Sequence, residues 1–447
     1  MKKKRKWPKV LGIIVGVILV LYFGGGLANY ICNVNLRNYI KTFAPIDYEG
    51  EQIVPEKDEN GYYTFTTDRE LKIMHIADIH IGGGIFSYKR DKKSIYEVMT
   101  MVAAEKPDLV ILGGDNTYAL FKIGFNGGGT FNNKMVARTV ISMFEQEGVY
   151  FSTVFGNHDT ESVDYANRQE VGELYESDEF RYCIFEEEFT DPEADTVPSV
   201  SNQCILVKNT DGKITKVVML LDTNAYVNTS FIAAILGKYD TIHQAQIDWA
   251  KDVITDLSRK EGLPEGEYLK SLVFVHIPIG EYMTAYNELF TDVYDANGKL
   301  TGFVQNDDPE NTEFVWGHWD ETKVYYGGVS NTDILPEDQD LLFETLAEEM
   351  GSMEAIICGH DHVNNNVVYY KGVMLSYDYT VDNIAYQNAI SVVGNQRGAE
   401  VITVSTDGSF TVDHKNAYTD YGCDPDKYLH VDVDGVRYPE LYRTIEQ

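Results

Sequence analysis

Apolar residues form one long uninterrupted segment near the N-terminus and only short runs elsewhere. From Val10 to Ala28 each of the nineteen residues is apolar or glycine, and a basic segment, residues 1–9, precedes them. A helix of that length, at about 1.5 Å per residue, spans the ~30 Å hydrocarbon layer of a bilayer. The pattern predicts a transmembrane signal anchor over residues 10–28, with the basic segment in the cytoplasm and the rest of the chain extracytoplasmic. The alternative is a cleaved signal peptide, for which Gly26 and Ala28 supply the small residues of a cleavage site, and the protein is then secreted.

Short apolar runs that end in polar residues and glycine recur along the rest of the chain. Four of them are typical of buried strands, because they are four to seven residues long and rich in Ile and Val: Leu71–Ala77, Leu109–Leu112, Val149–Phe155 and Ala355–Cys358. Further strand candidates are Cys204–Val207, Val217–Leu221, Leu272–Val275, Val367–Tyr370 and Val401–Val404. Apolar residues recur at helical spacing over 246–258 and 338–350, and the second pattern ends at Gly351. Strands interleaved with helices indicate a layered α/β domain.

The remaining segments complete the predicted organisation. Residues 29–60 are mixed and polar without a sustained period, and they are expected to form a stalk. The folded domain is expected over residues 61–416. Within it, residues 281–336 lack strong periodicity, which indicates a surface excursion or lid. Residues 417–447 form an acidic, Tyr-rich C-terminal tail.

Composition excludes one class of partner. The 447 residues contain 70 Asp and Glu against 37 Lys and Arg, for a formal net charge of −33, and six of those bases precede residue 10. Such a surface repels nucleic-acid phosphate, so nucleic-acid recognition is not expected. The five cysteines show no C-x-x-C spacing, which argues against a zinc finger or a redox pair.

The ends of five predicted strands carry side chains that a hydrophobic core does not favour. They read Asp78-Ile79-His80, Gly114-Asp115, Gly156-Asn157-His158-Asp159, His276, and Gly359-His360-Asp361-His362. In layered α/β sheets, ligands bind beyond the carboxyl ends of the strands, where such loops converge. Carboxylate, amide and imidazole groups together make a metal site, and seven such ligands are too many for one ion. Two adjacent metals that share one carboxylate fit the count.

With these motifs in this order, the chain resembles the calcineurin-like metallophosphoesterase superfamily over about residues 70–415. The segment Asp159–Tyr175 and the sequence His276-Ile277-Pro278 resemble its small, purple-acid-phosphatase-like branch. The resemblance implies an α/β fold, a four-layer αββα sandwich of two mixed β-sheets flanked by helices. It also implies that Asp115 bridges two metal ions. The other ligands it implies are Asp78, His80 and His362 for the first ion and Asn157, His276 and His360 for the second.

Residues beside the implied ligands are expected to act on the substrate. His158 is expected to protonate the leaving group, and Asp159 to orient its ring or, alternatively, to cap a helix. Arg168 and Asn157 are expected to contact the substrate, and a solvated surface position is the alternative for Arg168.

In one motif this chain differs from the purple acid phosphatases. Asp115-Asn116-Thr117-Tyr118 has the spacing at which purple acid phosphatases bind ferric iron through the tyrosine. That group has glycine where this chain has His80. Because His80 is available as a ligand, Tyr118 is predicted to be a neighbour of the metals.

The predicted function is a metal-dependent phosphatase that hydrolyses phosphate esters outside the cytoplasm by direct attack of metal-bound hydroxide. Imidazole and oxygen ligands admit two divalent ions, with manganese as the first expectation and iron, zinc or magnesium as alternatives. The expected partners are a small phosphate-ester substrate and, through the N-terminal helix, the membrane. Two alternatives remain: a phosphodiesterase or nucleotidase that uses the same site, and a non-catalytic, metal-containing surface binding protein. The pattern does not specify the ester, a preference for mono- or diester, or the oligomeric state.

Overall fold

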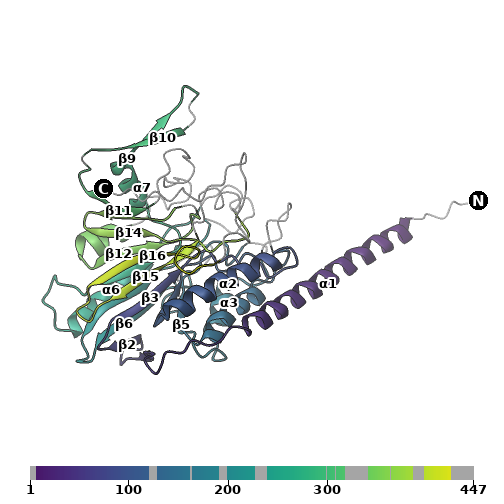
Figure 1. The fold of residues 1–447 in the computed structure, drawn as a ribbon, viewed down its shortest axis with the longest axis horizontal. Coiled ribbons are helices and arrows are strands. Elements are labelled where there is room, and N and C mark those ends of the chain that lie inside the picture. The colour runs from purple at the N-terminus through teal and green to yellow at the C-terminus, as the bar shows by residue number, and fades with distance from the viewer. Residues whose placement is uncertain are drawn as a thin grey trace, which may run out of the picture.

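Two β-sheets lie face to face, and helices cover their outer faces (Figure 1). The computed structural model describes residues 7–119, 128–161, 164–190, 199–226, 239–297, 300–307, 309–317, 341–362, 364–385 and 397–423. The layers are helix, sheet, sheet, helix, so the predicted four-layer αββα sandwich of two mixed sheets is confirmed.

The larger sheet has nine strands. In order across the sheet they are β1 (Glu56–Lys57), β2 (Tyr63–Thr67), β6 (Gln203–Asn209), β7 (Ile214–Leu220), β8 (Ser271–Phe274), β12 (Met353–Cys358), β14 (Val373–Tyr377), β13 (Asn366–Tyr370) and β11 (Thr312–Gly317). Strands β7, β8, β12 and β14 run parallel to one another at its centre. The smaller sheet has five strands: β16 (Phe410–Asn416), β15 (Gly398–Val404), β3 (Leu71–Ile76), β4 (Leu109–Leu112) and β5 (Tyr150–Thr153). Strands β3, β4 and β5 are parallel neighbours, so their carboxyl ends meet at one edge of that sheet.

Three hydrophobic clusters separate the layers. Between the sheets, Ile73 and Ile111 of the smaller sheet share a core with Phe65, Ile205 and Leu272 of the larger one. The smaller sheet packs its other face against α1 (Trp7–Ile40), α2 (Tyr88–Glu105), α3 (Asn133–Glu147) and α4 (Arg168–Tyr175). The larger sheet packs its outer face against α6 (Gln244–Lys260), α7 (Glu281–Leu289) and the π-helical turn η1 (Glu344–Glu349).

Helix α1 is longer than the apolar segment that predicts it. Its large apolar side chains from Val10 to Phe23 are exposed. It is the one helix among the described residues that is long and apolar enough to cross a membrane, over Lys9–Ile40. Its last third is buried against the domain through Asn33, Leu36 and Ile40. Residues 29–40, expected in a stalk, therefore continue the helix and pack on α2 and α3, because their buried residues recur at helical spacing on one face.

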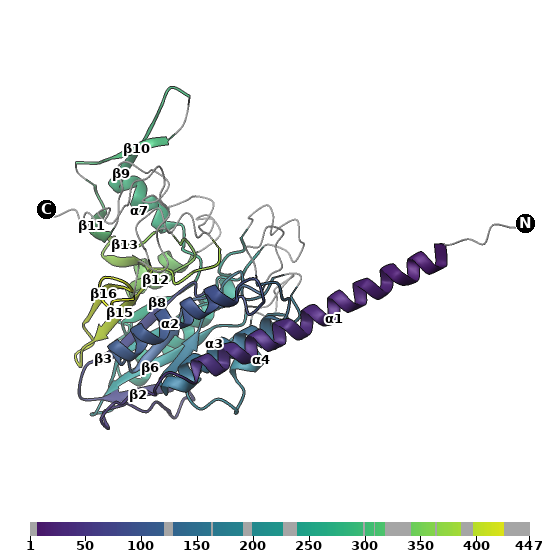
Figure 2. The same cartoon turned by 45° about the vertical axis from the view of Figure 1, so that its right-hand side comes forward.

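The segment expected to be a lid, residues 281–336, is partly structured. Helix α7 buries Tyr282, Ala285 and Leu289 in the outer core, and β11 forms the edge of the larger sheet beside β13. Between them, β9 (Phe290–Tyr294) and β10 (Leu300–Gln305) form a two-stranded sheet that projects from the domain (Figures 1 and 2). Residues 318–336 of that expected lid lie outside the described residues, as do residues 424–447 of the expected tail.

Candidate metal centre

Candidate ligands follow five parallel strands, β3, β4, β5, β8 and β12, at their carboxyl ends. Four of these residues adopt left-handed backbone conformations: Asp78 (φ 53°), His80 (φ 52°), Asp115 (φ 50°) and His360 (φ 76°). This region is rare for residues other than glycine, and such strain gathers at functional sites. The sharp turns direct consecutive polar side chains back toward the strand ends.

A first group of ligand atoms surrounds one point. Asp78, His80, Asp115 and His362 are all buried, and each offers an atom within 4.8 Å of the others. The Asp115 Oδ2 atom lies 3.2 Å from His80 Nε2, and the Asp78 Oδ1 atom lies 3.2 Å from His362 Nε2. Around an ion with ligands at about 2.1 Å, neighbouring ligand atoms lie about 3.0 to 3.4 Å apart, so the spacing fits a shared cation.

A second group shares Asp115 with the first. Its members are Asp115, His276 and His360. The same Asp115 Oδ2 atom lies 3.4 Å from His276 Nε2, and His276 Nε2 lies 3.3 Å from His360 Nδ1. The Asn157 side chain is 1% exposed, and its Oδ1 atom has no hydrogen-bond donor. A buried carbonyl oxygen without a donor is what a cation site requires of its amide ligand. The structure thus brings the seven predicted ligands to one edge of the two sheets.

A backbone amide holds one oxygen of each candidate carboxylate ligand. His158 N donates to Asp115 Oδ1 at 2.7 Å, and His360 N donates to Asp78 Oδ2 at 2.9 Å. The approach requires glycine at the preceding turn, because a Cβ atom on Gly156 would lie 2.1 Å from Asp115 Oδ1. Each loop therefore fixes the carboxylate of another loop.

The electrostatics of the cluster favour a bound cation. Burial opposes the charge on Asp115, but His276 and His158 outweigh it and hold the pKa of that carboxyl well below its usual range. The Asp115 carboxylate likewise outweighs burial and raises the pKa of His276 to about 9. Burial and the adjacent His276 lower the pKa of His360 to about 3. The protons on the imidazoles compensate buried carboxylates here, which is the role that a divalent ion takes over on binding.

Two groups orient the imidazole ligands. His276 Nδ1 donates to the Gly113 carbonyl at 2.8 Å, which leaves Nε2 free to bind a metal. Asp382 lies between two ligands, with Oδ2 3.2 Å from His362 Nδ1 and Oδ1 3.6 Å from His80 Nδ1. Sequence reasoning missed Asp382. It follows strand β14 by five residues and belongs to no motif, so no signal in the pattern identifies it.

The predicted proton donor has a different partner from the one expected. His158 Nδ1 lies 2.6 Å from Glu161 Oε1, and the two side chains are 12% and 7% exposed. Asp159, expected to orient that ring, instead accepts backbone N–H groups from Gly156 at 2.9 Å and Thr117 at 3.0 Å. It therefore ties the Asp115 and Asn157 loops together. Residues 157–160 form bends and not a helix, so the i, i+3 spacing of His158 and Glu161 gave no signal that would have found this pair.

Arg168 is not placed to contact a substrate. Its guanidinium is 2% exposed and binds Asp222 through both Nε and NH2. Its remaining N–H groups donate to the carbonyls of Phe155 and Gly156 and to the Thr160 hydroxyl. All five donors are thus used inside the protein. Neither the expected substrate contact nor the alternative, a solvated surface position, is found. Arg168 is instead a buried brace: its hydrogen bonds support the loop that carries Asn157 and His158.

Tyr118 stacks flat on a ligand ring. Its ring centroid lies 4.8 Å from that of His80, with 6° between the ring planes. His158 meets the Tyr118 ring edge-on at 4.9 Å. The tyrosine ring therefore packs against two imidazoles of the site. That Tyr118 is a neighbour of the metals and not a ligand stays a prediction.

A third buried cluster has a different spacing. Asp378, Glu400 and His414 lie close enough to be metal ligands, and His75 adjoins them. Here the contacts are 2.7 Å between His414 Nε2 and Glu400 Oε1 and 2.9 Å between His75 Nδ1 and Asp378 Oδ2. These are hydrogen-bond distances, shorter than those between the ligand atoms of the two groups above. We therefore assign this cluster to hydrogen bonding within the core.

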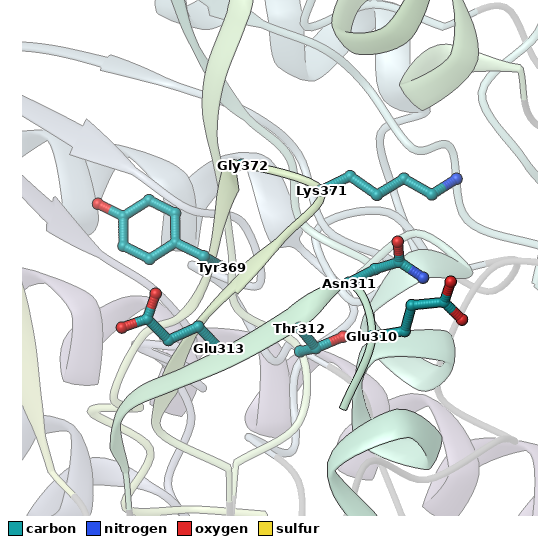
Figure 3. A pocket seen from close by; sticks show the side chains of 7 residues that line it. All are labelled: Glu310, Asn311, Thr312, Glu313, Tyr369, Lys371 and Gly372. Atoms are coloured by element: carbon teal, nitrogen blue, oxygen red, sulfur yellow. The ribbon is translucent and has the colours of Figure 1, made fainter. Parts of the chain in front are cut away.

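A surface hollow lies away from the candidate ligands. It is lined by Glu310, Asn311, Thr312, Glu313, Tyr369, Lys371 and Gly372, at the edge formed by β11 and the turn between β13 and β14 (Figure 3). None of the candidate ligands borders it, so it is separate from the site.

Comparison with known proteins identifies the class of site. The family model described as calcineurin-like phosphoesterase matches residues 71–364. Three relatives from Arabidopsis thaliana are each 22% identical to this chain. Probable inactive purple acid phosphatase 14 aligns over 70% of this chain and 71% of its own length. The corresponding shares are 83% and 82% for probable inactive purple acid phosphatase 28, and 78% and 81% for probable inactive purple acid phosphatase 29.

Proposed function

The chain belongs to the calcineurin-like phosphoesterase family, and from that premise we propose that it is a dinuclear-metal phosphatase. The single observation that carries the proposal is the Asp115 Oδ2 atom, which lies 3.2 Å from a ligand of the first group and 3.4 Å from a ligand of the second. One oxygen spaced to share a cation with an imidazole of each group could serve both cations. We propose manganese as the resident metal, with iron, zinc or magnesium as alternatives, because the donors are imidazole and oxygen.

When bound, two divalent ions would polarise the phosphate and lower the pKa of a water molecule between them. The protein's own groups supply the rest. The buried Asn157 Oδ1 atom has no hydrogen-bond donor and is the proposed amide ligand. Backbone amides hold Asp115 and Asp78, so that these carboxylates need not move when charge develops. Asp159 keeps the two loops in register.

His158 is the proposed proton donor to the leaving oxygen. Glu161 occupies its Nδ1 atom, so that Nε2 carries the transferable proton. Glu161 thus acts as a positioning residue for His158, in the way that a buried acid orients a catalytic imidazole elsewhere.

The relatives' names motivate an alternative. Each of the three is called probable inactive, and by analogy this chain would be a metal-containing surface protein without turnover. Six ligands at cation spacing, and the buried Asn157 Oδ1 atom without a donor, support catalysis here. Helix α1 supports a membrane anchor, and we propose that the domain lies outside the cytoplasm, because the basic residues precede the apolar segment.

The test is a metal-by-substrate screen of the full chain. Purified protein is assayed with an aryl phosphate monoester and an aryl phosphate diester in the presence of manganese, iron, zinc or magnesium. We expect metal-dependent hydrolysis, with the monoester preferred; preference for the diester would favour a phosphodiesterase. Absence of turnover with every metal would refute the phosphatase and favour the binding protein.

Two substrates with different leaving groups test the proposed roles of His158 and Glu161. Substitution His158→Ala or Glu161→Gln is expected to slow hydrolysis of an alkyl phosphate by about 10²-fold or more, because its alkoxide needs a proton. Hydrolysis of 4-nitrophenyl phosphate, whose leaving group is stable as an anion, should change by less than about threefold. Glu173→Gln, on the exposed face of α4, is the matched control. An equal loss on both esters would show that Glu161 serves folding instead.

A further inference from the structure

Four exposed apolar side chains gather where α1 leaves the domain. They are Ile85, Phe86, Phe131 and Tyr165, with exposed fractions of 51%, 38%, 45% and 76%, and we call them the apolar rim. Their loops touch: Tyr165 N donates to Phe131 O at 2.7 Å, and a Cβ atom on Gly129 would lie 2.6 Å from the Phe86 ring. Exposed aromatic and aliphatic groups gathered in this way mark a surface that meets another apolar phase.

Asn29 fixes the rim to a definite height on α1. It is the first polar residue after the apolar segment that ends at Ala28. Its Nδ2 atom donates to Gly129 O at 2.7 Å, and its Oδ1 atom accepts Ile85 N at 3.2 Å. Both loops of the rim are therefore bound to the point at which α1 would emerge from a bilayer. If α1 spans the membrane, these side chains lie at its surface.

The candidate metal centre lies farther from the expected bilayer than Asn29 does, but by a limited distance. Asn33, one turn beyond Asn29, donates to the Gly83 carbonyl, and its Oδ1 atom accepts the Thr139 hydroxyl at 2.9 Å. Four helical residues rise about 6 Å, and the three residues from Gly83 back to His80 span at most about 10 Å. The ligand His80 is therefore at most about 20 Å from the level of Asn29, so the candidate metal centre lies close to the membrane surface if α1 spans the bilayer.

Charge near the rim differs from that of the whole chain. The protein carries a net charge of −33, which opposes contact with anionic lipid. Directly after the rim, α2 begins with Lys89 and Arg90, both at least partly exposed, and the Arg90 guanidinium donates to the Phe86 carbonyl at 3.1 Å. Figures 1 and 2 show α1 leaving the domain beside α2 and α3. Apolar side chains next to cations are typical of surfaces that lie in a membrane interface.

We propose that the apolar rim lies in the bilayer surface and that the substrate of the metal centre is a phosphate monoester carried by a membrane lipid. This inference rests on the proposed phosphatase and on α1 as a membrane span. The reaction is hydrolysis. The water oxygen bonds to phosphorus, the bond from phosphorus to the lipid oxygen breaks, and His158 gives that oxygen its proton. The proton that the water loses restores His158, and the products are the lipid alcohol and inorganic phosphate.

The first experiment locates the rim without using activity. The full chain is reconstituted in phosphatidylcholine vesicles with acyl-brominated lipid, in a Trp7→Phe background. After subtraction of the signal of the three remaining tryptophans, measured in the Trp7→Phe parent, fluorescence from Phe86→Trp and Phe131→Trp is expected to fall by roughly half or more, because bromine on the acyl chains quenches only tryptophan close to them. The matched control is Val54→Trp, since Val54 is also exposed (58%) but follows the far end of α1. Rim tryptophans quenched no more than the control would overturn the proposal.

The second experiment tests the substrate class. The double variant Phe86→Ser with Phe131→Ser and its parent hydrolyse dioleoyl phosphatidate in vesicles and 4-nitrophenyl phosphate in solution. We expect the variant to lose about tenfold or more in kcat/KM on the lipid and to keep its rate on the soluble ester. If the parent hydrolyses the soluble ester and not the lipid, the lipid substrate is wrong while the phosphatase stands. If the parent hydrolyses neither ester, the phosphatase itself has failed, and rim quenching still decides the membrane contact.

Discussion

The buried acidic side chains differ in whether hydrogen-bond donors and imidazoles surround their carboxylate groups. Asp115 and Asp78 have backbone donors and imidazoles around them. Glu147, the last residue of α3, is 1% exposed, and neither of its carboxylate oxygens has a hydrogen-bond partner. Burial alone raises the pKa of the Glu147 carboxyl to about 9.

The pKa of Glu147 predicts a stability that falls as pH rises. Between its ordinary pKa near 4.5 and about 9, the folded chain holds a proton that the unfolded chain has released. Folding is therefore destabilised progressively across this window, and the loss is complete above it. Glu147→Gln keeps the shape of the protonated acid, so we expect it to raise stability at pH 8 by on the order of a few kcal/mol and to have little effect near pH 5.

Thermal unfolding of both proteins from pH 5 to pH 9 measures this difference. The control is Glu173→Gln, a change of the same kind at an exposed position. Melting temperatures that separate toward low pH would contradict the assignment, because the sign of the linkage would then be reversed.

Helix α4 and the residues after strand β5 hold the candidate site in place, although α4 supplies no candidate ligand. Arg168 begins α4, and its capping residue Asn167 forms a reciprocal capping box with Glu170. The guanidinium then crosses to Asp222, after β7, and to the carbonyls after β5. The loop that carries Asn157 and His158 is thereby fastened to both sheets.

Arg168→Lys is expected to destabilise the protein by about 3 kcal/mol, because an ammonium group cannot replace five N–H donors and leaves Asp222 buried with a poorer partner. The matched control is Arg138→Lys, whose pair with Glu179 is exposed on both sides and is expected to lose less than about 1 kcal/mol. Denaturant unfolding measures both. A raised KM at unchanged stability would instead restore the substrate contact first expected for Arg168.

The whole molecule is organised so that two sheets complete one site. Asp78, Asp115 and Asn157 come from the smaller sheet, whereas His276, His360 and His362 come from the larger one. Each of the two groups draws ligands from both sheets, so a cation bound in either would join the two halves of the sandwich, and metal binding is expected to be coupled to stability.

Removal of metal is therefore expected to lower the melting temperature by about 5 °C or more, with recovery on addition of manganese. Elemental analysis should find about two ions per chain in the parent and fewer than about one after Asp115→Asn, because both groups lose their shared oxygen. Asp378→Asn, in the hydrogen-bonded cluster, is the control and should keep both ions. Equal metal loss in the two variants would contradict the assignment of that cluster.

Local patterns along the chain were sufficient for the strands and for the ligand types. The predicted strand Leu71–Ala77 corresponds to β3 (Leu71–Ile76), and Leu109–Leu112 is β4. Burial on both faces makes such runs continuously apolar, and this signal depends only on neighbouring residues. Residues 281–317 gave no such signal, because β9 and β10 lie mainly outside the core and β11 is an edge strand.

The amino-acid sequence alone thus specifies a layered α/β domain, an apolar N-terminal segment and a set of side chains of metal-ligand type placed after strands. These features depend on contacts between near neighbours. Other features depend on which distant segments meet. These include the brace formed by Arg168, the contact of Asp382 with two ligands, and the docking of residues 29–40 on α2 and α3. They arise from packing between segments tens to hundreds of residues apart, and such contacts leave no periodic mark in the chain.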